Sequence, residues 1–221
     1  MISMSTLARY PSLAGRGVLV TGGATGIGET LVEQFVAQGA KVGFIDIDAA
    51  SGDALAERLG RGAAAPPQFV AADLTDVPTL EAAIAEVRQR VGPLTVLLNN
   101  AANDLRHAID SVTSASWDAA VAVNLKHQFF AARAVADDMR AAGGGSIVNL
   151  GSVSWKRRQG GMPVYLACKA AVHGLTRALA REACLAGPLL PLHIASMALF
   201  LAADDSAMCT AQEFVVDGGW T

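Results

Sequence analysis

The chain has 221 residues and a mass of 22.7 kDa, 52% of its residues are hydrophobic, and its mean hydropathy is +0.36. A sequence this apolar is not intrinsically disordered, yet no apolar run approaches the ~18 residues that a membrane-spanning helix needs. The net charge of −3, without a basic cluster, argues against nucleic-acid binding as the main function. The three cysteines, Cys168, Cys184 and Cys209, have neither disulfide nor metal-ligand spacing, and the first residues lack the apolar run of a signal peptide. We therefore expect a cytoplasmic protein with reduced thiols and without a metal site.

Short, almost entirely apolar runs alternate along the chain with longer, alanine-rich amphipathic stretches. The predicted strands are Val18–Thr21, Lys41–Asp46, Gln68–Ala71, Leu94–Leu98, Ser146–Leu150 and Phe214–Val216. The predicted helices are Ile27–Gln38, Ala49–Leu59, Thr79–Val91, Ser116–Ala142, Val164–Glu182 and Leu192–Ala203. Apolar strands that alternate with helices are typical of a parallel sheet covered on both faces. The sequence predicts a doubly wound α/β sheet with helices on both faces, in a single domain over residues 1–221.

A glycine-rich turn connects the first predicted strand to the first predicted helix. Its sequence is Thr21-Gly22-Gly23-Ala24-Thr25-Gly26-Ile27-Gly28. Gly22 would allow the tight turn, Gly26 would let the backbone approach a pyrophosphate, and Gly28 would let helix and strand pack closely. The helix N-terminus adds unpaired N–H groups and the positive end of its dipole. A lone glycine motif also occurs in ordinary turns, but the strand and helix around this one favour a Rossmann-type dinucleotide site. The candidate phosphate-binding residues are Gly22, Thr25, Gly26, Ile27 and Gly28.

Asp46 ends the second predicted strand, 18 residues beyond Gly28. A carboxylate there accepts hydrogen bonds from the ribose hydroxyls of an adenosine and repels a 2′-phosphate. Because Ala24 offers no positive charge to hold such a phosphate, we expect NAD rather than NADP. Asp46 could instead be only a helix N-cap, and Asp48 competes for either role. Further candidates for the adenosine pocket are Ile47, Asp73 and Leu74.

Tyr165 and Lys169 are four residues apart, so they share one face of a helix. A free phenol is only about 0.1% ionised at pH 7, but a neighbouring ammonium and a cationic nicotinamide would both favour the phenolate. Lowering a phenol pKa by ~3 units takes about 4 kcal/mol, which two close positive charges in a dry site can supply. Ser152 follows the fifth predicted strand, where it could hydrogen-bond a reacting oxygen. Taken alone, the pair could also be a tyrosine at the core edge beside a solvated lysine.

Together, these motifs resemble the short-chain dehydrogenase/reductase family. The matching residues are Thr21–Gly28, Asp73, Asn99-Asn100-Ala101, Asn124 in Val-Asn-Leu, Ser152, Tyr165-x-x-x-Lys169 and Val216-Asp217-Gly218-Gly219. The resemblance implies that Tyr165 is the general base, that Lys169 stabilises the phenolate and binds the cofactor ribose, and that Ser152 polarises the substrate oxygen. It further implies that Asn124 holds a water in the proton relay and that Asn100 and Ala101 line the cofactor. Ala102 departs from the glycine that is usual in the family.

The substrate candidates rest on a finer resemblance, to the branch of the family that oxidises aldoses at carbon 1 to lactones. The stretches that carry it are Asn103–His107, Ser154-Trp155, Tyr10–Leu13 and Met208–Gln212. We expect Asn103, Ser154 and Gln159 to bind the substrate, although they could equally form solvated loops. The runner-up is a 3-oxoacyl-type carbonyl reductase, which Asp46 disfavours because biosynthetic reduction usually draws on NADPH. The resemblance also implies a homo-oligomer, a dimer of dimers, with a small-molecule substrate. The charge and the lack of a long apolar run, noted above, argue against nucleic acid and membrane as partners.

The usual sixth strand and substrate-covering lid of the family have no counterpart near residues 182–184. Glu182 leads directly to Ala183–Pro188, without a strand-like run or a Pro-Gly turn. Either the printed residues leave out a lid, or the polypeptide lacks it. We favour the first explanation, because deleting an interior strand is costly to a packed sheet; an intact mass of 22.7 kDa would refute it. A chain that truly lacks the lid could be a cofactor-binding scaffold without catalysis.

Overall fold

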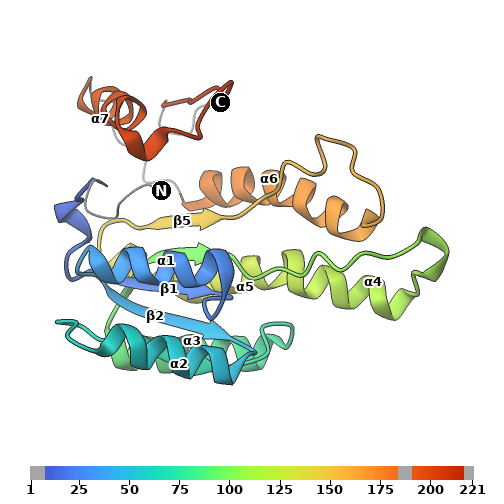
Figure 1. Cartoon of the computed structure of the whole chain (residues 1–221), viewed down its shortest axis with the longest axis horizontal. Helices are drawn as coiled ribbons and strands as arrows, with labels where there is room; N and C mark the ends of the chain where they lie inside the picture. The colour runs from blue at the N-terminus through green and yellow to red at the C-terminus, as the bar shows by residue number, and fades with distance from the viewer. Residues whose placement is uncertain (1–7, 184–190, 217–221) are drawn as a thin grey trace.

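The computed structural model describes residues 8–183 and 191–216, and its centre is one parallel sheet. The strands are β1 (Gly17–Thr21), β2 (Lys41–Asp46), β3 (Gln68–Ala71), β4 (Leu94–Asn99) and β5 (Ser146–Asn149). They lie in the order β3-β2-β1-β4-β5 (Figure 1). The strand order reverses between β1 and β4, and ligands of such sheets bind outside the carboxyl ends of the strands at this point. The predicted doubly wound α/β fold is confirmed.

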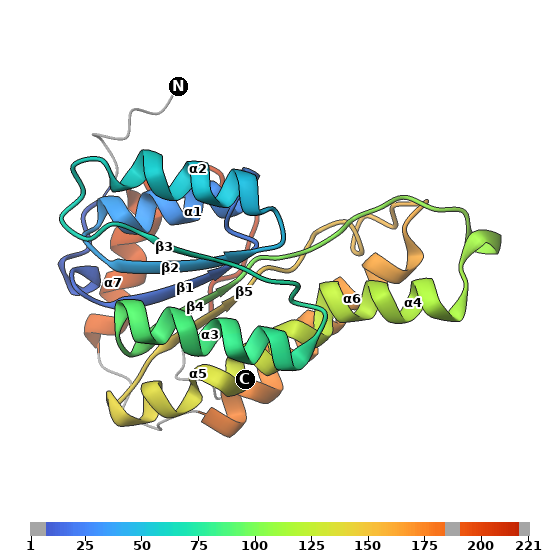
Figure 2. The same ribbon diagram turned by 90° about the horizontal axis from the view of Figure 1, so that it is seen from below.

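Helices cover both faces of the sheet. The helices α1 (Gly26–Ala37) and α2 (Ala49–Gly60) lie on one face, and α3 (Val77–Val91) and α5 (His127–Ala141) lie on the other (Figure 2). The remaining helices are α4 (Ser114–Val121), α6 (Pro163–Ala183) and α7 (Pro191–Ala202), with short 3₁₀ turns at Pro11–Leu13, Ile109–Ser111 and Asp204–Ser206. In Figure 1, α7 lies beyond the β5 edge of the sheet.

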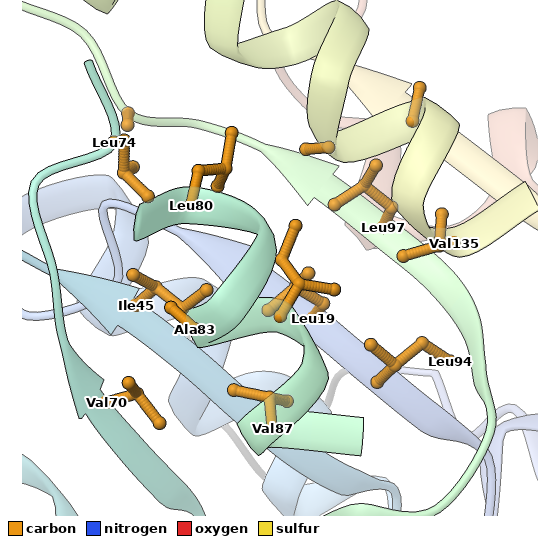
Figure 3. Packing of buried hydrophobic residues seen from close by; sticks show 14 of the residues in the cluster. Leu19, Ile45, Val70, Leu74, Leu80, Ala83, Val87, Leu94, Leu97 and Val135 are labelled. Atoms are coloured by element: carbon orange, nitrogen blue, oxygen red, sulfur yellow. The ribbon is translucent and has the colours of Figure 1, made fainter. Parts of the chain in front are cut away.

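Two apolar layers hold the helices to the sheet. On one face, strand residues such as Leu19, Ile45 and Leu97 pack against α3 and α5 (Figure 3). On the other face, Phe44 packs in a cluster with Val32 of α1. Every residue of β1 is buried, which agrees with its apolar run Val18–Val20. The core therefore fixes the carboxyl ends of β1, β2 and β4 as a rigid platform.

The predicted helix Ser116–Ala142 is interrupted in the structure. Between α4 and α5 the chain forms a π-helical turn, η4 (Ala122–Lys126), and the N–H of His127 reaches back five residues to the Ala122 carbonyl. Such single π turns occur frequently at functional sites. Asn124, the candidate for the relay water, lies in this turn and is fully buried.

The prediction of a strand at Phe214–Val216 is wrong. These residues belong to no strand, and the side chains of Phe214 and Val215 are 38% and 57% exposed. A strand needs a neighbour to satisfy its backbone groups, and within the described residues no strand pairs with the outer edge of β5. Val148 of β5 is 43% exposed as a result. The predicted gap near residues 182–184 borders residues 184–190, which lie outside the described part of the chain.

Candidate active site

The glycine turn between β1 and α1 is closely packed at Gly22, Gly23 and Gly28 and open at Gly26. A Cβ on Gly22 would lie 2.6 Å from the Cα of Ala101, and a Cβ on Gly28 would lie 1.8 Å from the Gly22 carbonyl oxygen. Gly26 has a φ of +61°, and a Cβ there would meet nothing within 4 Å. Thr25 and Ile27, on either side of Gly26, are exposed. The open space therefore lies at the N-terminus of α1, where the dipole and free N–H groups fit a pyrophosphate.

The Asp46 carboxylate ties this turn to the end of β2. Its oxygens accept the N–H of Ala24 at 3.0 Å and that of Asp48 at 3.1 Å. Asp48 itself caps α2, because its carboxylate accepts the N–H of Ser51 at 3.0 Å and its hydroxyl at 2.6 Å. These hydrogen bonds lower the pKa of Asp48. The capping role therefore belongs to Asp48, and Asp46 lies beside the glycine turn with the exposed Ile47 next to it.

Residues at the end of β4 brace the same turn from the other side. The Asn100 amide donates to the Gly22 carbonyl at 2.7 Å, and the Thr21 hydroxyl accepts the N–H groups of Asn100 and Ala101 at 3.1 and 3.2 Å. After β3, Asp73 accepts the N–H and hydroxyl of Thr75 at 2.9 and 2.7 Å, while Leu74 is buried in the core. The structure thus brings the predicted cofactor residues around one sheet edge, with Leu74 beneath the surface.

Asn124 acts as a clamp between η4 and the loop after β4. Its Oδ1 accepts the Asn103 N–H at 2.9 Å, and its Nδ2 donates to the carbonyls of Asn103 and Ala120, both at 3.0 Å. Its side-chain amide therefore bonds within the protein, and its backbone carbonyl accepts an N–H of the Gln128 side-chain amide at 3.4 Å. The Asn103 side chain also bonds locally, since its Oδ1 accepts the Leu105 N–H at 3.0 Å.

Tyr165 and Lys169 lie one turn apart on α6, at the carboxyl end of β5. The Lys169 ammonium is 5.7 Å from the centroid of the Tyr165 ring and donates to the Leu150 carbonyl at 2.7 Å. Lys169 is only 2% exposed, and burial lowers the pKa of its ammonium. Lys169 and Ser152 line the same cavity of about 330 Å³. The lysine is thus a buried charge beside the phenol and not a solvated neighbour of it.

Two of the three substrate candidates share a turn, because the Gln159 N–H donates to the Ser154 carbonyl at 3.2 Å, while Asn103 lies in the loop after β4. Ser154 lies next to Ser152 and donates its N–H to the Ser152 hydroxyl at 3.1 Å. Gln159 lines a second cavity, of about 270 Å³, together with His107 and Leu166. Asn103 is held against Asn124, as described above. Of the three, Ser154 is therefore nearest in the chain to a predicted catalytic group.

Two buried polar residues, His127 and Gln128, were missed by sequence reasoning. They follow η4 directly and are 1% and 0% exposed. Neither ring nitrogen of His127 has a hydrogen-bond partner, and burial, together with the charge of Lys169, lowers the pKa of His127 to about 4. The sequence signal that could have found them is a His-Gln pair directly after Val-Asn-Leu-Lys, within the predicted helix Ser116–Ala142. Within residues 8–183 and 191–216, no cluster of His, Cys, Asp and Glu could hold a metal, and no helix is long and apolar enough to cross a membrane.

Comparison with known proteins identifies the class that this fold and site define. Residues 16–187 match the family described as short chain dehydrogenase. The chain is 37% identical to D-xylose 1-dehydrogenase of Caulobacter vibrioides, covering 96% of the chain and 98% of the relative. It is 39% identical to a probable galactose dehydrogenase of Rhizobium meliloti, covering 96% and 97%. The protein belongs to the short-chain dehydrogenase/reductase family.

Solved structures of the same fold contain either dinucleotide. An NADH-dependent reductase complexed with NAD superposes with a TM-score of 0.72 at 26% identity, covering 78% of this chain and 74% of that one. L-sorbose reductase from Gluconobacter frateurii, complexed with NADPH and L-sorbose, gives 0.73 at 25% identity, covering 77% and 65%. The comparisons therefore support a nicotinamide cofactor, and the choice between NAD and NADP must be argued from the site of this chain.

Proposed function

We propose that this protein is an NAD-dependent aldose 1-dehydrogenase, which oxidises a sugar at carbon 1 to the lactone. The observation that carries the proposal is the near-full-length identity to D-xylose 1-dehydrogenase, in a chain that retains Ser152, Tyr165 and Lys169. The runner-up, a 3-oxoacyl-type reductase, has no comparable support among these relatives.

In this reaction the Tyr165 phenolate takes the proton of the carbon-1 hydroxyl. The buried Lys169 ammonium favours the phenolate, because a nearby opposite charge stabilises an anion more strongly where water is excluded. The Ser152 hydroxyl donates to the same substrate oxygen and holds carbon 1 toward the cofactor. NAD, when bound, accepts the hydride from carbon 1. The proton then leaves by way of the Lys169 ammonium and a water held at Asn124.

NAD is preferred to NADP on the geometry of Asp46. The carboxylate is held by the N–H groups of Ala24 and Asp48, so its position does not depend on a bound ligand. A fixed negative charge at the end of β2 accepts ribose hydroxyls and repels a 2′-phosphate. Neither Ala24 nor Ile47, which lie beside Asp46, can neutralise such a phosphate.

A second candidate function, a cofactor-binding scaffold without catalysis, is favoured by the unpaired edge of β5. The match to D-xylose 1-dehydrogenase runs over 249 positions while this chain has 221 residues, so at least 28 positions (249 less 221) have no residue here. We propose that these positions include the sixth strand and lid. The cavity that holds Ser152 and Lys169 is lined by Asn149 of β5, by the loop that follows β5 and by α6, with no further strand beside β5 in the described residues.

Three measurements separate these functions. An intact mass of 22.7 kDa for the purified protein would mean that the lid is truly absent, and a heavier chain would carry it. Calorimetric titration with NAD and NADP tests the cofactor site alone. A panel of aldoses, with 3-oxoacyl substrates as a comparison and NADH absorbance as the readout, tests catalysis. Binding of NAD without turnover of any substrate would refute the enzyme and leave the scaffold.

A homo-oligomer is also proposed, because α4 and α5 expose aromatic side chains. Trp117 of α4 is 45% exposed and Phe129 of α5 is 42% exposed. Large apolar side chains on neighbouring helices favour a protein–protein interface. Sedimentation analysis of the parent and of Phe129→Lys tests the proposal; a parent that sediments as a monomer would refute it.

A further inference from the structure

A second cavity lies at the N-terminal end of α6, and the mechanism above does not use it. Its volume is about 270 Å³, and its walls come from the loop after β4, the loop after β5 and the first turn of α6. The two loops are joined where the His107 N–H donates to the Gly161 carbonyl at 2.8 Å. This hydrogen bond joins backbone atoms, so the cavity keeps its frame when a side chain in its wall is changed.

Two side chains in the wall have polar groups that the rest of the protein does not use. The His107 Nδ1 atom is buried and has no hydrogen-bond partner. The side-chain amide of Gln159 makes no hydrogen bond to any other residue that the structure describes. Buried atoms without a partner also occur on Asn99, His127 and Gln128, but none of these residues lines the cavity. Since buried polar atoms are generally paired, an unpaired one in a cavity wall points to a ligand.

The rest of the wall is mostly apolar. Ile109, Pro163 and Leu166 contribute hydrocarbon surface, and glycine backbone completes it. An apolar pocket with a few convergent polar groups is typical of a small-molecule site, for which volumes of about 300–1,000 Å³ are usual. A sugar ring carries hydroxyl groups on its edge and C–H groups on its faces, so it matches such a wall. The volume suits a monosaccharide and is too small for a dinucleotide.

The cavity borders the residues that we assign to catalysis. Leu166, in its wall, is the chain neighbour of Tyr165. On the loop after β5, the Gln159 N–H donates to the Ser154 carbonyl at 3.2 Å, and the Ser154 N–H donates to the Ser152 hydroxyl at 3.1 Å. The adenosine half of the site lies at the ends of β1 and β2, on the other side of β4. The cavity is therefore on the substrate side of the site.

We propose that His107 and Gln159 bind a hydroxyl group of the aldose that is remote from carbon 1, and so determine which aldoses the protein accepts. A hydroxyl group both donates and accepts, so it can pair with the imidazole nitrogen in either tautomer and with the amide at the same time. A sugar that lacks this hydroxyl group leaves both side chains unpaired, which is costly in a buried site. The inference rests on the proposed function, because it names the side chains that select the sugar for that reaction.

The test compares aldoses that differ by one hydroxyl group. For the parent, kcat/KM is measured with D-xylose and D-galactose, and then with the monodeoxy analogues of the sugar that reacts faster. Loss of one remote hydroxyl group should lower kcat/KM by about tenfold, the value of one hydrogen bond. In His107→Leu and in Gln159→Leu this ratio should fall toward one, while the ratios for the other hydroxyl groups stay as in the parent. His107→Asn, which keeps a polar atom near the place of Nδ1, should restore most of the ratio.

Leu105→Ala is the control, because Leu105 belongs to the loop after β4, is 74% exposed and does not line the cavity. It should leave every ratio unchanged. The proposal is overturned if no remote hydroxyl group contributes in the parent, if both leucine variants keep the parent's ratios, or if Leu105→Ala changes them equally. If one leucine variant does not fold, the other, which comes from a different loop, decides.

Failure to oxidise any aldose would refute the proposed function and would leave the subsite open to a separate measurement. Saturation-transfer NMR of D-xylose and D-galactose with the NAD-loaded protein reads sugar binding without turnover. A signal in the parent that is lost in His107→Leu and retained in Leu105→Ala supports the subsite. No signal in the parent, or equal signals in the parent and His107→Leu, overturns it.

Discussion

Acidification should cost this protein stability through His127, by an amount that its burial determines. The pKa of His127 is about 4 in the folded chain, against 6.5 for the ordinary side chain. Between these values the unfolded chain binds a proton that the folded chain does not, so stability falls as the pH falls from 6.5 toward 4. At 1.36 kcal/mol per pKa unit, the loss from this one side chain is about 3 kcal/mol. That is a large part of the 5–15 kcal/mol typical of folded proteins, about a third in the middle of that range.

The assay is urea unfolding at several pH values between 4 and 7, for the parent and for His127→Leu. Carboxylates such as Asp48 and Asp76, whose pKa values are lowered by capping hydrogen bonds, also stabilise the fold less as the pH falls. They are present in both chains, so the difference between the two pH slopes isolates the histidine. Val135→Ala, a buried control on the same helix, should lower stability equally at every pH. Parallel pH slopes for the parent and His127→Leu would refute the reasoning.

Three further predictions concern the cofactor turn and the base. Asp46→Ala should lower kcat/KM with NAD by about ten- to a hundredfold, the value of a hydrogen bond to a charge. It should also lower the ratio of kcat/KM with NAD to kcat/KM with NADP. Equal kcat/KM of the parent with NAD and NADP would contradict the role assigned to Asp46. Tyr165→Phe should lose turnover by about 10²- to 10⁴-fold while calorimetry still detects NAD binding, and wild-type turnover would exclude Tyr165 as the base. Gly28→Ala should destabilise the fold, because the new Cβ would lie 1.8 Å from the Gly22 carbonyl oxygen. Gly26→Ala should cost only about 1 kcal/mol of backbone strain, because a Cβ there has open space, but it should weaken NAD binding. Thermal unfolding compared with calorimetric binding separates these two glycines, and similar losses of stability in both would refute the contrast.

The buried strands and the phosphate turn could be predicted because their signals are local. The ranges Lys41–Asp46 and Gln68–Ala71 are the same in sequence and structure, since the central residues of both strands are apolar and those of β2 are buried. The glycine turn could be predicted equally well, because the close approach of the Gly22 carbonyl leaves room only for glycine at position 28. The sequence could not show which of Asp46 and Asp48 caps α2, since both carboxylates precede that helix.

The features that could not be predicted depend on contacts between distant segments. Phe214–Val216 has the composition of a strand, but pairing requires a neighbour that composition cannot supply. The π turn at Asn124 interrupts a stretch with continuous helical periodicity. The Asn124 side chain bonds to the backbone of Asn103, which is distant in the sequence, so the periodicity gives no sign of this contact. The sequence shows His127 as one of four histidines without ligand spacing, and only the fold shows that its ring is buried without a hydrogen-bond partner.

The two halves of the candidate site rest on unequal supports. The nucleotide half lies on β1, β2 and β4, which are interior strands, and is cross-linked by Thr21, Asp46 and Asn100. The catalytic half depends on β5, whose alternate residues are exposed, and on Leu150, which follows β5 directly and whose carbonyl accepts a hydrogen bond from Lys169. In the part of the chain that the structure describes, β5 is paired on one edge only, which leaves the strand free to open locally. Amide hydrogen exchange should therefore be faster in β5 than in β1, and added NAD should protect the glycine turn more than β5; equal protection of both strands would mean that the β5 edge is covered in solution.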